Sequence, residues 1–112
     1  MSETRYDVGD LVRVFVQFRD LDGDKAAPTA VAAAFVSPSG VTTQVAGVDI
    51  HVDTSIDPET LAPYVGRFYI DLLLTEGSDV EPYWVRFEGT GAVQAADEQD
   101  VWVRVPNVVI VP

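Results

Sequence analysis

The clearest pattern in the chain is a strict alternation of apolar and polar residues in two runs, residues 82–88 and 100–105. Successive side chains of a strand point to opposite faces of a sheet, so the alternation predicts two strands that each have two different faces. A Gly-rich and acidic connection between the runs predicts that they form a hairpin. The aliphatic face would hold Tyr83, Val85, Phe87, Val101, Val103 and Val105, and the opposite face Trp84, Arg86, Glu88, Asp100, Trp102 and Arg104.

Five further strands are predicted upstream, at residues 12–18, 29–36, 41–46, 48–53 and 66–72. About seven short strands separated by turn residues, with no long helix-period segment, predict an all-β antiparallel sandwich that ends near residue 105. The segment DPETLAPY predicts one helical turn, with Asp57 as its N-cap and Pro58 at the first helical position. The predicted core consists of Val14, Val16, Phe35, Phe68, Ile70, Val85, Phe87 and Val103.

The last seven residues, PNVVIVP, form a separate apolar tail over residues 106–112. Val108, Val109, Ile110 and Val111 are consecutive and therefore do not fit a half-buried alternation. Prolines at both ends predict a short extended strand with a defined docking place. The tail would fold along its own sandwich edge or add to a neighbour's sheet by β-augmentation. The second alternative is favoured because the last strand of the sandwich already ends at Val105.

The charge balance is strongly acidic, with 18 acidic residues against 7 basic ones and a net charge of −11. Such a charge argues against direct binding of DNA or RNA, because phosphate contacts need a basic face. It fits either a high-salt environment or an ordinary acidic protein in which Arg replaces Lys, since Lys25 is the only lysine. No apolar run approaches the roughly 20 residues of a membrane span, so no membrane partner is expected. The absence of cysteine excludes disulfides, thiolate metal sites and cysteine catalysis.

Several segments follow one another in a distinctive order: YDVGDLVRVFVQFRDLDG, TAVAAAFVSPSG, VGRFYIDLLL, PYWVRFEGTG and DVWVRV. In this order the chain resembles the immunoglobulin-like accessory structural proteins of tailed bacteriophages and related archaeal tailed viruses. The resemblance implies a single immunoglobulin-like β-sandwich over residues 1–105. It further implies a non-enzymatic virion protein of the head, neck or tail. Its partners would be capsid, neck or tail subunits, and it would be present in multiple copies per particle.

Two groups of polar residues have spacings that metal sites use. Asp20, Asp22 and Asp24 alternate like the first ligands of a calcium loop, but the glycine and the final acid of that loop are not at their required positions. An Asp/Gly β-turn is therefore favoured. Asp49, His51 and Asp53 would share one face of a strand, with Ile50 and Val52 directed to the core. An exposed polar face is favoured over a metal site there, and no cofactor is expected.

Enzymatic chemistry finds little support in the sequence. His51 is the only histidine, and none of the serines lies in a nucleophile motif, so no Ser–His–Asp triad is predicted. Three classes of function remain open. They are a docking protein of a viral particle, a module that binds carbohydrate or a host surface, and, as the least favoured, a calcium-dependent or enzymatic protein.

The interface residues predicted for docking are Trp84, Arg86, Trp102, Arg104 and the apolar tail residues Val108, Val109, Ile110 and Val111. Trp and Arg dominate binding energy at many protein interfaces. One hairpin register would place Trp84 opposite Trp102. A slip of two residues would place Trp84 opposite Arg104 and Trp102 opposite Arg86, which would allow cation–π stacking. The alternative is that both Trp side chains are covered by a loop or belong to the core.

Overall fold

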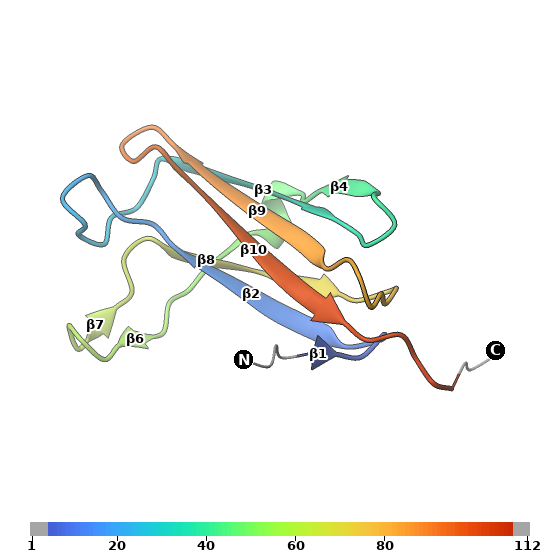
Figure 1. Ribbon diagram of the computed structural model, residues 1–112. Helices are drawn as coiled ribbons and strands as arrows, with labels where there is room; N and C mark the ends of the chain where they lie inside the picture. The colour runs from blue at the N-terminus through green and yellow to red at the C-terminus, as the bar shows by residue number, and fades with distance from the viewer. Residues whose placement is uncertain (1–4, 109–112) are drawn as a thin grey trace.

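The computed structural model describes residues 5–108, which form two sheets packed face to face as a sandwich (Figure 1). The predicted all-β fold is confirmed. Apart from the 3₁₀ turn η1 (Gly47–Asp49), the regular elements of the described residues are the strands β1 (Arg5–Tyr6), β2 (Leu11–Gln17), β3 (Ala30–Val36), β4 (Thr42–Gln44), β5 (His51–Val52), β6 (Ile56–Asp57), β7 (Ala62–Pro63), β8 (Arg67–Leu73), β9 (Tyr83–Thr90) and β10 (Ala95–Val103).

The order of the strands is that of an immunoglobulin-like sandwich. The larger sheet has the order β1-β10-β9-β3-β4, and the smaller sheet has the order β2-β8-β5. With β2, β3, β9 and β10 taken as strands B, C, F and G, the two sheets are the B–E–D and G–F–C–C′ layers of that fold. β1 runs parallel to the end of β10. The structure has more strands than the seven predicted, partly because β6 and β7 form an additional small hairpin between β5 and β8.

The core lies between the sheets and is built from the inward side chains of β2, β3, β8, β9 and β10, together with Phe18, Leu74 and Val93 from the segments that follow β2, β8 and β9. Its buried apolar members are Val14, Val16, Phe18, Ala33, Ile70, Leu72, Leu74, Tyr83, Val85, Phe87, Val93, Val101 and Val103. Two predicted core residues, Phe35 and Phe68, are only partly buried. Each stands opposite a short edge strand, with Phe35 paired to Thr43 and Phe68 paired to Val52.

The β9–β10 hairpin has the predicted faces but neither of the predicted registers. Trp84 stands opposite Asp100, and Tyr83 stands opposite Val101. The hairpin is also longer than expected, because β10 begins at Ala95 within the segment predicted as a connection. β10 ends at Val103, so Val105 lies beyond the sheet and is 47% exposed instead of belonging to the aliphatic core face.

The strand predicted at residues 48–53 is largely replaced by the 3₁₀ turn η1 and the two-residue strand β5. This break reverses the expected orientation at its end, since Val52 is exposed and Asp53 is buried. The buried Asp53 carboxylate has polar partners at this position. It accepts hydrogen bonds from the backbone N–H (2.9 Å) and the hydroxyl of Ser55, and it pairs with Arg67 at 3.0 Å. The hydrogen bonds from Ser55, followed by the nearby Arg67 charge, lower the pKa of Asp53.

The helical turn predicted at Asp57 is wrong, because this segment forms the β6–β7 hairpin, in which Asp57 pairs with Ala62. The Asp57 carboxylate accepts a hydrogen bond from the backbone N–H of Glu59 at 2.9 Å, as an N-cap residue would. The Asp57 backbone carbonyl accepts one from Leu61 at 2.8 Å, which closes the hairpin loop. Asp57 is only 2% exposed, and its second carboxylate oxygen pairs with Lys25. The only lysine therefore ties the β6–β7 hairpin to the loop between β2 and β3.

The apolar tail is described only at its start. Residues 104–108 follow β10 without regular structure and are exposed, with Val108 at 77%. Val109, Ile110 and Val111 lie outside the described residues. In Figure 1 the chain after β10 leaves the sandwich at the end where β1 lies.

Candidate docking surface

The outer face of the five-stranded sheet contains the predicted interface residue Trp84. We call the part of this surface around Trp84 the Trp84 face. It is defined by residues that stand opposite one another in the sheet, namely Ala32, Ala34, Val36, Thr42, Gln44, Trp84, Arg86, Glu88, Glu98 and Asp100. Trp84 is flanked by Asp100 on β10 and Val36 on β3, and it is 42% exposed. The alternatives in which Trp84 belongs to the core or is covered by a loop are therefore wrong.

Arg86 lies on the same face and is fully engaged with two carboxylates. Its guanidinium donates hydrogen bonds to Glu88 and Glu98, both at 2.9 Å. These two bonds raise the pKa of Arg86. Glu98 is the residue opposite Arg86 in the register, so the cation–π contact predicted between Arg86 and Trp102 is wrong. With Asp100 included, the Trp84 face carries three carboxylates against one guanidinium, and the Arg5 guanidinium lies next to it, over the Trp102 ring.

Two further residues of the predicted interface, Trp102 at the end of β10 and Arg104 just after it, bind the N-terminal strand. The guanidinium of Arg5 lies over the Trp102 ring, 5.2 Å from its centre, and the Trp102 indole N–H donates a hydrogen bond to Asp100 at 3.1 Å. Arg104 pairs with Asp7 at 2.9 Å, and its backbone N–H donates to the carbonyl of Tyr6 at 2.9 Å. Trp102 and Arg104 therefore hold β1 against β10, while Trp84 remains available.

The centre of the Trp84 face is shallow because β3 supplies alanines there. Ala32 and Ala34 stand opposite Glu88 and Arg86. The small side chains leave a hollow of about 210 Å³ that Gln44, Arg86 and Glu88 border. An exposed indole and an apolar hollow, with fixed charges around them, offer contact to a protein surface that has a protruding apolar side chain.

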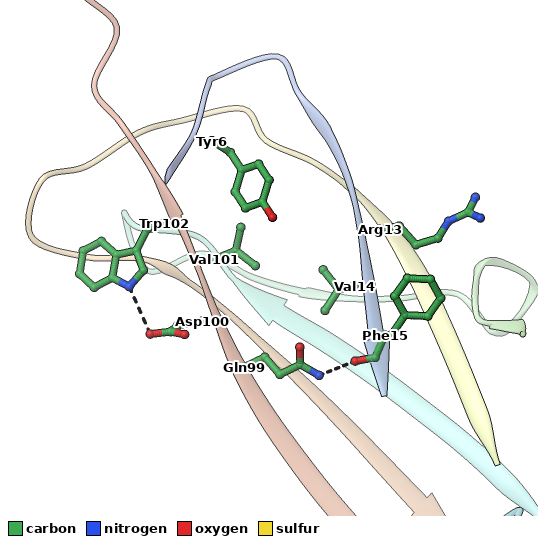
Figure 2. A pocket seen from close by; sticks show the side chains of 8 residues that line it. All are labelled: Tyr6, Arg13, Val14, Phe15, Gln99, Asp100, Val101 and Trp102. Carbon is green, nitrogen blue, oxygen red and sulfur yellow. Dashed lines mark hydrogen bonds between the residues drawn. The ribbon is translucent and has the colours of Figure 1, made fainter. Parts of the chain in front are cut away.

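A second hollow lies at the open side of the sandwich, between β2 and β10 (Figure 2). Its volume is about 450 Å³, and its lining residues are Tyr6, Arg13, Val14, Phe15, Gln99, Asp100, Val101 and Trp102. The Gln99 amide crosses the gap and donates a hydrogen bond to the backbone carbonyl of Phe15. The Gln99 side chain thus links β10 of one sheet to β2 of the other, and it forms one wall of the hollow.

The outer face of the three-stranded sheet carries a second cluster, which the sequence analysis did not identify. The Arg13 guanidinium lies over the Tyr69 ring at 4.1 Å, and the Phe15 and Tyr69 rings are 5.5 Å apart. Arg67 covers the Phe15 ring at 4.4 Å. Asp71 binds Arg13 at 2.8 Å, and this hydrogen bond lowers the pKa of Asp71. The sequence does contain a signal for this cluster, which is the alternation of Arg13, Phe15 and Gln17 on β2 and of Arg67, Tyr69 and Asp71 on β8. That signal predicts a shared face only when the pairing of β2 with β8 is known.

The candidate metal residues have local partners. Asp20 closes the loop between β2 and β3, because its carboxylate accepts the backbone N–H groups of Asp22 and Asp24 at 2.9 and 3.0 Å. This confirms the predicted Asp/Gly turn, in which Gly23 has a φ of +86°. His51 packs against Tyr69 at a ring distance of 5.2 Å. Within residues 5–108, no three His, Cys, Asp or Glu side chains form a group that would hold a metal ion.

Comparisons with known proteins give no further identification. No protein family, curated protein or solved structure matches the chain at a significant level. Over the described part of the chain, no helix has both the length and the apolar character needed to cross a membrane.

Proposed function

We propose that this protein is a non-enzymatic accessory structural protein of a tailed virus particle, where it docks on capsid, neck or tail subunits through the Trp84 face. The observation that carries the proposal is the 42% exposure of Trp84 on an outer sheet face. Trp is among the residue types that contribute most to binding when a partner buries them. The virion setting rests on the ordered sequence elements that resemble accessory proteins of tailed viruses.

The geometry of the Trp84 face favours a protein partner over a carbohydrate. A sugar platform built from Trp84 and Trp102 needs two free rings, but Arg5 lies over the Trp102 ring. Ala32 and Ala34 leave an apolar hollow on this face, which a protruding apolar side chain of a protein partner can fill. The three carboxylates favour a partner whose apolar centre has a basic rim, since complementary charge speeds and orients association. Many copies on one particle would add avidity to a modest single-site affinity.

The test is binding of purified protein to particles assembled without it, measured by co-sedimentation over a range of protein concentrations. Trp84→Ala should weaken binding by about 30-fold, which corresponds to about 2 kcal/mol for a residue that dominates an interface. Leu21→Ala is the matched control, because Leu21 is fully exposed in the loop between β2 and β3, outside the Trp84 face. This control should bind like the unaltered protein.

Equal binding by the Trp84→Ala variant would contradict docking through this face. A complete lack of binding by the unaltered protein, together with binding to immobilised glycans that Trp84→Ala abolishes, would replace the proposal with carbohydrate recognition. Thermal melting of each variant checks that the sandwich remains folded.

A further inference from the structure

Among residues 5–108, strand β10 has a long edge on which no other strand pairs. Residues 95–101 pair with β9 on one side. On the other side, β1 reaches only the end of β10, where it pairs with Trp102 and Val103. An unpaired strand edge is a template for an added strand from another chain.

The backbone groups on this edge point outward in a definite register. The N–H of Arg104 donates to Tyr6 of β1, whereas the carbonyl of Val103 accepts from Ser78 on the opposite side, both at 2.9 Å. Backbone groups of successive residues in a strand point to opposite sides. The N–H and C=O groups of Ala96, Glu98 and Asp100 therefore face the open edge and can bind an added strand.

The hollow of about 450 Å³ lies beside this edge (Figure 2). Val14, Phe15 and Val101 supply apolar surface to its lining. A strand added to β10 would direct alternate side chains toward this opening, as in other cases of β-augmentation. Aliphatic side chains therefore suit the inward positions of the added strand.

The charges of β10 select what can bind. Asp97, Glu98 and Asp100 are exposed on the strand. Pairing of two β10 edges would bring these carboxylates together, and like charges opposite one another destabilise a sheet. The four-residue run from Val108 to Val111 carries no charge and is rich in β-branched residues, which favour strands.

The described start of the tail, residues 106–108, is poorly placed to reach this edge in its own chain. β1 occupies the β10 edge at Trp102 and Val103, between the start of the tail and the open residues. Residues 104–108 are exposed beyond that end of the sandwich. In extended form, the seven residues 106–112 span about 23 Å, which equals the length of residues 95–101 as a strand.

We propose that the apolar segment 108–111 of a second copy of this chain adds as a strand to the open β10 edge, with alternate aliphatic side chains directed to the hollow between β2 and β10. The contact joins copies of the protein and does not use Trp84. The proposal of self-association is therefore independent of the proposal of docking on the particle.

The experiment measures self-association of the full chain by sedimentation velocity over a concentration range, at a salt concentration high enough to screen the net charge. Glu98→Pro removes one backbone N–H from the open edge, a change that edge strands tolerate. This variant should weaken self-association by at least about tenfold. Glu98→Ala is its matched control, because it removes the same carboxylate but keeps the N–H. The control should associate as well as the unaltered chain or better.

A second pair of variants tests the tail. Val109→Asp places a carboxylate in the apolar run against the acidic edge and should abolish association, whereas Asn107→Asp adds the same charge outside the run and should not. Circular dichroism and melting verify that all four variants fold. A chain that stays monomeric at every concentration would overturn the proposal. So would association that both Glu98→Pro and Val109→Asp leave intact, or a Val109→Asp variant that unfolds, since the tail would then belong to its own sandwich.

Discussion

The hydroxyl of Tyr83 accepts a hydrogen bond from the backbone N–H of Thr75 at 2.9 Å, and so joins the start of β9 to the chain that leaves β8. The N–H of Glu76 donates to the same oxygen at 3.2 Å. Tyr83 is 1% exposed, with its ring in the core and its hydroxyl at the corner of the loop. A tyrosine at the start of strand F with this kind of bond to upstream backbone is a feature of immunoglobulin-like domains.

Tyr83→Phe should therefore lower the free energy of unfolding by about 1–3 kcal/mol, because two backbone N–H groups lose their acceptor. Urea denaturation followed by fluorescence measures this change. Tyr69→Phe removes a hydroxyl from the outer face of the smaller sheet and should change the free energy of unfolding by less than about 0.5 kcal/mol. Equal effects of the two substitutions would show that the corner does not stabilise the fold.

Removal of core aromatic rings should distinguish the centre of the sandwich from its margin. Phe87 is completely buried, whereas Phe68 is only partly buried. Phe87→Ala should cost about 3–5 kcal/mol of the free energy of unfolding through lost burial and a cavity, and Phe68→Ala should cost clearly less. Chemical denaturation of both variants provides the comparison. A larger loss of unfolding free energy for Phe68→Ala than for Phe87→Ala would mean that the core is centred closer to β5.

The pair of Lys25 and Asp57 predicts a specific response to acid. The hydrogen bond from Lys25, followed by that from the backbone of Glu59, lowers the pKa of Asp57 in the folded protein. Because the folded-state pKa is below the unfolded value of about 3.9, the ion pair stabilises the fold above that value. This stabilisation is lost as the pH falls through the folded-state pKa.

Asp57→Asn should accordingly reduce the free energy of unfolding near pH 7, and its difference from the unaltered protein should shrink as the pH falls from about 5 to about 2. Glu59→Gln alters a more exposed partner of the same lysine and is the matched control, with a smaller expected effect. The measurement is urea denaturation at a series of pH values. A difference that does not vary with pH would show that the carboxylate charge of Asp57 is not the stabilising feature.

Salt should stabilise the protein. The net charge is −11, and five of the basic residues are already committed to ion pairs within residues 5–108. The excess carboxylates repel one another, and added salt screens this repulsion. The thermal midpoint should therefore rise between low salt and about 1 M salt. An unchanged midpoint would remove the reason to expect a high-salt environment, and a fall would indicate that local ion pairs outweigh the general repulsion.

The alternating pattern was sufficient to predict which side chains of the β9–β10 hairpin point inward. Phe87 is buried and Trp84 is exposed, as their positions in the pattern indicated. The pattern was not sufficient to predict the register. A shift of two residues leaves every side chain on its original face, so Asp100 and Trp102 were equally compatible as the residue opposite Trp84.

Regions without a clean period were predicted less well. The alternation around Val52 and Asp53 assumed an uninterrupted strand, but a 3₁₀ turn precedes β5 and Asp53 is buried among donors from distant sequence, including Arg67. The cluster around Tyr69 was missed for a related reason. It forms because β2 pairs with β8, more than fifty residues away in sequence, and a single sequence does not specify that pairing.

Cryo-electron microscopy of a tailed virus particle with this protein bound tests the central claim most directly. The account predicts density of a capsid, neck or tail subunit packed over Trp84, Val36 and Ala34, with Leu21 and Tyr69 outside the contact. A bound protein that presents Trp84 to solvent and contacts the particle through the Tyr69 side of the sandwich would contradict it.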